Sequence, residues 1–340
     1  IEDRFEARVR VTAELTEKNG KRVSYQQREA RVAATDQTAT ADSLVGEIYT
    51  LGLVAPRGRY HFKVTVEDLN QARRGLVYQF KNKKKQGEVQ GEIDMSDWLF
   101  KNPALSGIEF AWSTGDATPD TPFAKGPYEV LPHPSGYYGH FQDVLSAYYE
   151  IYDAPTLPNG RAYRLRTMIL GAAGDTLMES VDSLRASEGA AWPRVVSADI
   201  ASLPAGHYRF RLDLLGDDGR AAASSQGEFD VLWDADSWSP DAVDFYDITA
   251  ATLMTGGEAS AFRRLSRGEK EAKLAERWRS IDPTPDTAEN ELRRTLKARI
   301  DYANAHFTIY EKGMFSDRGR VWIRYGEPDE IQIERLPVSE

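Results

Sequence analysis

The charged residues that surround Gly319 are the densest group in the chain that could perform chemistry. They are Asp317, Arg318, Arg320, Asp329 and Glu330. Carboxylates next to arginines could serve a hydrolase as acid, base and anion-binding groups. However, the segment contains no nucleophile next to a base, and Ser316 lacks the Gly-x-Ser-x-Gly context of a hydrolase elbow. We favour the alternative, an ion-pair network that fixes tight turns onto a helix.

The histidines do not indicate a metal site. No two of them have the His-x-x-x-His spacing that puts two imidazoles on one helix face. They are His61, His133, His140, His207 and His306. Gly256-Gly257 also lacks the context of a phosphate-binding loop. We therefore expect neither a metal nor a cofactor.

An acidic run offers a second place where a cation could bind. It comprises Asp234, Asp236, Asp241, Asp244 and Asp247. Clustered carboxylates suit calcium, but the spacing is not that of an EF-hand loop. Ser239 and Pro240 indicate a linker and the start of a helix. We therefore favour a solvated acidic turn that stabilises a helix N-terminus.

Tryptophans could form a platform on which sugars stack. The candidates are Trp98, Trp112, Trp192, Trp233 and Trp238. Tryptophan in a β-sandwich more often fills the core or an interdomain contact. A carbohydrate-binding protein thus stays an alternative that requires exposed, coplanar rings.

Composition excludes several classes of function. The chain has no cysteine, which removes disulfides, thiolate metal sites and cysteine nucleophiles. Its net charge of −10 argues against nucleic acid as the main partner. No apolar run approaches the length of a membrane-spanning helix. The chain begins with Ile1, as it would if a leader had been removed.

One basic run departs from this acidity. It comprises Lys81, Lys83, Lys84 and Lys85. Charge runs usually face water, so we interpret these lysines as a solvated hairpin tip. The alternative is a docking patch for an acidic partner.

An internal repeat sets the expected architecture. Residues 56–68 and 204–214 share the pattern Pro-x-Gly-x-Tyr, followed by strict alternation of apolar and polar side chains. Alternation of this kind predicts a half-buried antiparallel strand. A tyrosine directly after such a turn is typical of immunoglobulin-like sandwiches. The polar positions of the second copy are His207, Arg209, Arg211 and Asp213, and we expect them to face outward.

The sequence predicts a mainly β chain with a C-terminal α+β module. We expect a first β-sandwich at 1–118, a linker or crossover at 119–136, a second sandwich at 137–235 and a helical module at 236–340. Asp286 is the expected N-cap of the clearest helix, with Glu289 completing a capping box. Leu292, Leu296 and Ile300 give this helix an apolar stripe. The stretch from Arg320 to Tyr325 is expected to be a strand that packs on it.

The last part of the chain contains several short motifs in a fixed order. They are Tyr302-Ala303-Asn304 with Phe307, Gly313-Met314-Phe315-Ser316-Asp317, Arg318-Gly319-Arg320, and Gly326 followed by Pro328-Asp329-Glu330. This order resembles the GWxTD-domain family, a module of bacterial envelope proteins. Met314 stands where the family has tryptophan, and Ser316 stands where it has threonine. The resemblance gives no reaction, and family members continue beyond the position of Glu340.

The resemblance and the paired sandwiches imply a non-catalytic protein outside the cytoplasm. We expect a scaffold or accessory subunit that contacts proteins of a membrane-anchored assembly and lies in the periplasm or cell envelope. A narrower hypothesis is the periplasmic face of a photosynthetic reaction-centre and antenna complex. The alternatives are an envelope hydrolase that uses the carboxylates of the C-terminal module and a carbohydrate-binding protein.

Overall fold

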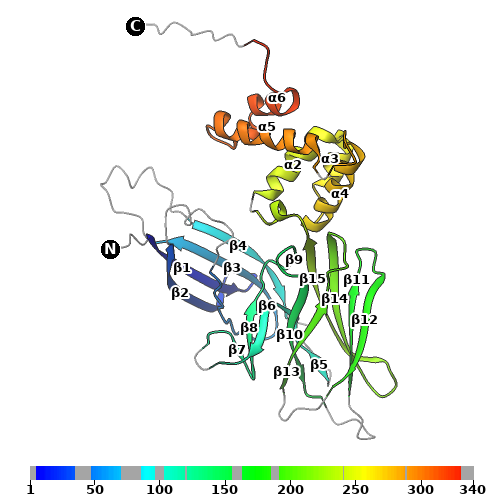
Figure 1. Ribbon diagram of the computed structural model, residues 1–340. Coiled ribbons are helices and arrows are strands. Elements are labelled where there is room, and N and C mark those ends of the chain that lie inside the picture. The colour runs from blue at the N-terminus through cyan, green and yellow to red at the C-terminus, as the bar shows by residue number, and fades with distance from the viewer. Residues whose placement is uncertain are drawn as a thin grey trace, which may run out of the picture.

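A computed structural model describes residues 5–34, 47–69, 86–95, 103–118, 121–154, 163–184, 191–239, 241–287 and 289–330 (Figure 1). Strands occupy the N-terminal and central parts, and helices follow from residue 235 onward. The prediction of a mainly β chain with a helical C-terminal region is confirmed. Among the described residues, no helix is long and apolar enough to cross a membrane.

The N-terminal strands form one antiparallel sheet in the order β2-β1-β3-β4. The strands are β1 (Phe5–Thr16), β2 (Arg22–Ala34), β3 (Arg59–Asp68) and β4 (Gln86–Asp94). Val11, Ala13 and Leu15 alternate along β1 and are buried with Tyr60 of β3. Period-two alternation therefore sets which face of this sheet is apolar.

Two further sheets pack face to face around the largest core. One contains β5 (Ala104–Leu105), β6 (Glu109–Asp116), β7 (Ala124–Lys125), β8 (Tyr128–Pro132), β10 (Val144–Tyr152) and β13 (Ala191–Asp199). The other contains β9 (Tyr137–Gly139), β11 (Arg164–Leu170), β12 (Thr176–Ser183), β14 (Gly206–Leu215) and β15 (Ala221–Leu232). Tyr149 and Ile151 of β10 meet Phe210 and Leu212 of β14 in the shared core. The central part is therefore a β-sandwich.

The expected boundaries at residues 118 and 136 do not separate these units. β6, which we placed in the first sandwich, pairs with β10 of the central sandwich. The expected linker contains β8, which pairs with β6. Alternation identifies a strand and its buried face, but it carries no information about which sheet the strand joins.

The repeated turn has the same structure in both copies. The hydroxyl of Tyr60 donates to the carbonyl of Pro56 at 2.8 Å, and that of Tyr208 donates to Pro204 at 2.7 Å. Each tyrosine folds back over a glycine. A Cβ on Gly58 would lie 3.0 Å from the Tyr60 hydroxyl, and one on Gly206 would lie 3.3 Å from that of Tyr208. The Pro-x-Gly-x-Tyr pattern thus closes a tyrosine corner, as its sequence indicates.

Asp213 departs from the expected outward orientation. It is fully buried and accepts hydrogen bonds from Arg211, Ser224 and Arg166 of β11. Burial alone would raise the pKa of Asp213, but these hydrogen bonds outweigh it and lower the pKa. A carboxylate can occupy a buried position because its partners on neighbouring strands satisfy it.

The helical region lies at one end of the sandwich (Figure 1). Its elements are η1 (Ala235–Trp238), α2 (Ala242–Leu253), α3 (Gly256–Phe262), α4 (Arg267–Ser280), α5 (Glu291–Phe307), η2 (Gly313–Phe315) and α6 (Asp317–Tyr325). Tyr246, Phe262, Trp278, Ile300 and Met314 contribute to a separate core. These helices therefore form a unit with its own apolar interior.

Two sequence predictions for this region are wrong. The N-cap of α5 is Asn290, whose side chain accepts from the Arg293 amide at 2.9 Å, and not Asp286. Arg320 to Tyr325 belong to helix α6 and do not form a strand. Ser316 caps α6 at its N-terminus, and Gly326 ends it with a φ of 86°. These caps favour the helix over the β propensity of a short apolar stretch.

The helical unit joins the sandwich through α4, which packs on β14 and β15. The two backbones touch, because a Cβ on Gly268 would lie 2.2 Å from the Gly206 carbonyl oxygen. Glu271 closes the same joint. One of its carboxylate oxygens accepts from the amides of Trp233 and Asp234, at 2.8 Å each. The joint is therefore held by backbone contact and by a buried carboxylate.

Replacing Glu271 by glutamine should change how stability depends on pH. Burial raises the pKa of Glu271 above its ordinary value, so the folded state holds this proton more tightly than the unfolded state does. The favourable contribution is therefore complete below the unfolded pKa of about 4.3 and is lost as pH rises through the folded value. We expect the native protein to lose stability relative to Glu271→Gln over this range. Urea unfolding of both proteins from acidic to neutral pH tests this, and a constant difference would contradict it.

Candidate functional site

The motif glycines bring the backbones of α5, η2 and α6 into contact. A Cβ on Gly313 would lie 1.8 Å from the carbonyl oxygen of Ala303 in α5. A Cβ on Gly319 would lie 1.8 Å from the carbonyl oxygen of Gly313. No real Cβ tolerates such distances, so both positions require glycine. We call the structure built by α5, η2 and α6 the helix clamp.

Hydrogen bonds from the motif side chains complete the helix clamp. Asn304 accepts from the Met314 amide at 2.9 Å, and Thr308 accepts from the Gly313 amide at 2.8 Å. Ser316 donates to the Gly313 carbonyl at 2.7 Å and accepts from the Gly319 amide at 3.0 Å. Met314, at the tryptophan position, is buried in the helical core. The motif therefore performs a structural task in this chain.

A side chain from α5 caps the C-terminal end of α6. Gly326 ends the helix, and the guanidinium of Arg299 donates to the carbonyls of Ile323 at 3.2 Å and Arg324 at 3.4 Å. A cation at this end also interacts favourably with the helix dipole. Pro328, Asp329 and Glu330 follow as exposed residues beyond α6.

Three residues of the charged set, Asp317, Arg318 and Arg320, contribute to the helix clamp. Asp317 lies in the first turn of α6, where a carboxylate stabilises the helix. The guanidinium of Arg318 lies 4.8 Å from the Phe307 ring centre, and Arg320 donates to the Phe315 carbonyl at 2.9 Å. Each contact fixes η2 or α6 in place. The described contacts therefore favour the structural alternative for these residues over a hydrolase site.

The helix clamp presents an aromatic and basic outer surface. The Tyr302 ring stacks on Trp322 of α6 at 4.1 Å with a 9° interplanar angle, and on His306 at 3.9 Å. Val321 and Tyr325 belong to the same helix as Trp322 and are 59% and 73% exposed. We call Tyr302, Arg318, Val321, Trp322, Arg324 and Tyr325 the α5–α6 face. This face was not predicted from the sequence, because residues 320–325 were expected to form a strand, and the stack requires them to be a helix packed on α5.

The acidic run is neutralised by cations from the helices. Asp234 pairs with Arg293, Asp241 and Asp244 pair with Lys312 at 2.6 and 2.5 Å, and Asp247 pairs with Lys270 at 3.1 Å. Hydrogen bonds to Asp241 and Asp244 raise the pKa of Lys312. The described residues contain no group of potential metal ligands. The run thus ties the start of the helical region to α4, to the first turn of α5 and to Lys312, which directly precedes η2.

The described tryptophans take part in packing and in hydrogen bonds. Trp112 stacks on His133 at 3.7 Å, and burial lowers the pKa of this histidine to about 4. The indole groups of Trp233 and Trp238 donate to backbone carbonyls, and Trp192 is buried in the sandwich core. Trp192 is therefore a core residue, and the other three rings are half-buried in these contacts. Trp98 and the lysines at 81, 83, 84 and 85 lie outside the described residues.

Solved structures show only weak similarity to the chain. A red sea bream transglutaminase is 9% identical, with a TM-score of 0.24, over 68% of this chain and 28% of that one. A putative β-galactosidase from Bacteroides fragilis is 12% identical, with a TM-score of 0.24, over 66% of this chain and 30% of that one. A β-glucuronidase 2 from Bacteroides uniformis is 10% identical, with a TM-score of 0.25, over 68% and 26%. The chain thus spans less than a third of each, and such scores carry no argument about fold or activity.

Family comparison agrees with the motif geometry. No curated protein matches the sequence. The family model of the GWxTD domain matches residues 248–337, which run from within α2 through α6 and contain the whole helix clamp. The sequence resemblance to this family is therefore confirmed, and the chain carries a GWxTD domain in its C-terminal part.

Proposed function

We infer that this chain is a protein-binding scaffold or accessory subunit whose α5–α6 face docks an acidic segment of a protein partner. The observation that carries the proposal is the exposure of Val321 and Tyr325 beside the stacked Tyr302 and Trp322. Exposed apolar and aromatic side chains that gather on a rigid support are typical of protein contact surfaces. Tyrosine, tryptophan and arginine are also the residues that most often dominate binding energy.

Charge indicates the chemistry of the partner. Within helix α6, Arg318, Arg320 and Arg324 outnumber Asp317, and the exposed carboxylates of the segment 327–330 lie beyond the helix end. Carboxylates on a partner would complement this basic helix and speed its association. The apolar side of α6 is used within the domain, because Ile323 is buried and Trp322 lies flat against Tyr302.

The joint with the sandwich supports a scaffold role. Contact between Gly268 and Gly206, together with the Glu271 hydrogen bonds, sets the GWxTD domain firmly on the central sandwich. A partner bound at the α5–α6 face would therefore be held at a fixed position relative to the sandwich. Figure 1 shows that α5 and α6 lie on the side of the helical region away from the sheets.

The setting of this docking is part of the proposal. We place the chain outside the cytoplasm, in the periplasm or cell envelope, on a membrane-anchored assembly. A photosynthetic reaction-centre and antenna complex is the narrower hypothesis, which rests on the family resemblance alone. Isolation from gently solubilised membranes followed by cross-linking mass spectrometry tests it. A chain that stays in the soluble fraction without partners would contradict this setting.

Reversing one charge on the face tests the docking surface. Arg324→Glu should weaken binding of the main cross-linked partner by roughly tenfold or more, because it puts a carboxylate opposite an acidic segment. Arg220→Glu makes the same charge change at an exposed turn of the sandwich and should leave binding unchanged. The measurement is the partner's dissociation constant at two salt concentrations. Equal affinity of both variants would count against the α5–α6 face.

A further inference from the structure

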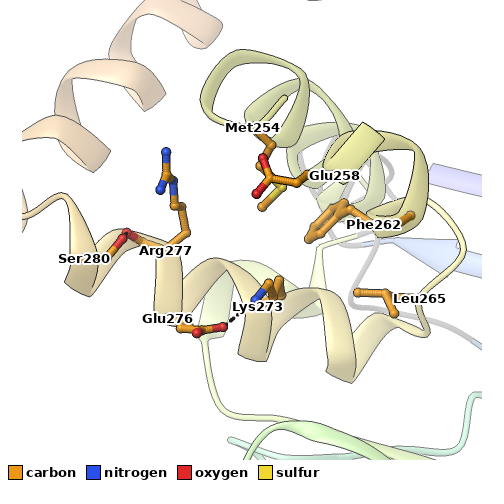
Figure 2. Close-up of a pocket in the computed structure, with 9 residues that line it drawn as sticks. Met254, Glu258, Phe262, Leu265, Lys273, Glu276, Arg277 and Ser280 are labelled. Atoms are coloured by element: carbon orange, nitrogen blue, oxygen red, sulfur yellow. Dashed lines mark hydrogen bonds and ion pairs between the residues drawn. The ribbon is translucent and has the colours of Figure 1, made fainter. Parts of the chain in front are cut away.

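Helices α3 and α4 of the same domain form a groove that shares no residue with the α5–α6 face. It encloses about 400 Å³ between α3 and α4. Met254, Ala261, Phe262 and Leu265 supply its apolar lining. Figure 2 shows Met254, Glu258 and Phe262 on one side, with Lys273, Glu276 and Arg277 on the other. An apolar floor between charged banks is typical of a groove that receives an amphipathic segment.

We call the α3 side and the α4 side of the groove its two banks, and these banks carry opposite charges. On the α3 bank, Glu258 accepts from the amide and hydroxyl of Thr255 at 2.8 and 2.9 Å. These hydrogen bonds lower the pKa of Glu258, so it is ionised at neutral pH. On the α4 bank, Lys273 pairs with Glu276 at 2.7 Å, and Arg277 donates to the Leu253 carbonyl at 2.9 Å. The carboxylate of Glu276 is thus already paired, whereas Arg277 donates to a neutral carbonyl.

The spacing along α4 fits a helical occupant. Lys273, Glu276, Arg277 and Ser280 follow at i, i+3, i+4 and i+7, so they line one side of the helix. Seven residues of helix extend over roughly 10 Å, which matches about two turns of a second helix. Met254 in the floor can adapt its shape to different apolar side chains. A compact anionic or cationic ligand would satisfy one bank and face a like charge on the other.

We propose that this groove binds an amphipathic α-helix of a protein partner in one orientation. The apolar ridge of that helix would lie on Met254, Phe262 and Leu265. A basic side chain on one flank would face Glu258, and an acidic side chain on the other flank would face Arg277. The groove is thus a second docking site, independent of the α5–α6 face and of its acidic partner.

A designed peptide tests this site in the intact chain. The probe is an amphipathic peptide of about 14 residues, near the shortest length at which an isolated helix forms. It has leucine at i, i+3, i+4 and i+7, lysine along one flank and glutamate along the other. A second peptide exchanges the two flanks. Fluorescence anisotropy should show that the two peptides differ in affinity by roughly tenfold.

Variants locate the bound peptide. Ala261→Trp fills the groove from an exposed position on α3, so it should abolish binding while circular dichroism stays native. Arg277→Glu should reduce or reverse the preference between the two peptides. Arg324→Glu, on the α5–α6 face, should leave binding unchanged, which separates this site from the proposed function. Equal affinity for both peptides, no binding of either up to millimolar concentration, or full binding by Ala261→Trp would overturn the proposal.

Discussion

Replacing Gly313 by alanine is expected to disrupt the helix clamp. The new Cβ would meet the Ala303 carbonyl oxygen at 1.8 Å. This oxygen belongs to the backbone of α5 and cannot swing away as a flexible side chain could. Overpacking typically costs 1–3 kcal/mol, and we expect about 3 kcal/mol or more here because the Cβ has no rotatable bond and meets a backbone oxygen. Urea unfolding followed by circular dichroism measures this loss.

A matched glycine in the same domain serves as the control. Gly257 lies near the start of α3, and a Cβ there would have no neighbour within 4 Å. Gly257→Ala should therefore be neutral or stabilise the protein by up to about 1 kcal/mol, as glycine is a poor helix former. Hydrogen exchange should show α5 and α6 opening in Gly313→Ala alone. Equal stability of the two variants would refute the helix clamp.

Replacing Gly268 by alanine should separate the helical unit from the sandwich. Its Cβ would lie 2.2 Å from the Gly206 carbonyl oxygen, so α4 must move away from β14. The sandwich core does not depend on this contact, since its residues come from the two facing sheets. We expect a loss of about 2–3 kcal/mol, mainly in the helical unit, with the sandwich unfolding later. Differential scanning calorimetry would show two transitions in place of a coupled one.

A second substitution at the joint between α4 and the sandwich shows whether the separation depends on the joint itself or only on the clash at Gly268. Glu271→Ala leaves the Trp233 and Asp234 amides without their acceptor, which costs roughly 1–3 kcal/mol for each buried group. It should produce the same separation of transitions as Gly268→Ala. If Gly268→Ala unfolds like the native protein in one transition at an unchanged midpoint, the rigid joint is refuted.

Local pattern predicted much of the β architecture. The Pro-x-Gly-x-Tyr repeat indicated two strands with a tyrosine corner, and both hydroxyls bond as that motif requires. The pattern could not assign β6 to the central sandwich, because sheet membership depends on pairing between distant segments. It also could not show that Asp213 is buried, since the partners Arg166 and Ser224 lie on other strands.

The helical region shows the limit of local propensity. Residues 320–325 have the apolar character of a strand, but the caps at Ser316 and Gly326 and the packing on α5 decide in favour of a helix. Asp286 and Asn290 are both good N-caps, and sequence alone does not choose between them. Packing selects Asn290, whose side chain also donates to the Trp278 carbonyl at the end of α4.

The candidate site was only partly accessible from sequence. The motif residues were identified, but their glycines do not mark turns around a strand: Gly313 and Gly319 allow close backbone contacts, and Gly319 lies inside helix α6. The outer face was not foreseen, because Tyr302 and Trp322 become neighbours only when the clamp closes. The cations that neutralise the acidic run were missed for the same reason, since Lys312 is far from Asp241 along the chain.

Site-specific photocrosslinking from the α5–α6 face tests the docking proposal most directly. A photoreactive amino acid would replace Tyr325 in the chain produced by its native host, and Leu177, an exposed apolar residue of β12, would be replaced as the control. We expect position 325 to crosslink one protein that carries an acidic segment, with mass spectrometry placing the crosslink in that segment. Position 177 should give no such product. Equal crosslinking from both positions, or none from position 325 under conditions where the chain is folded, would contradict the proposed function.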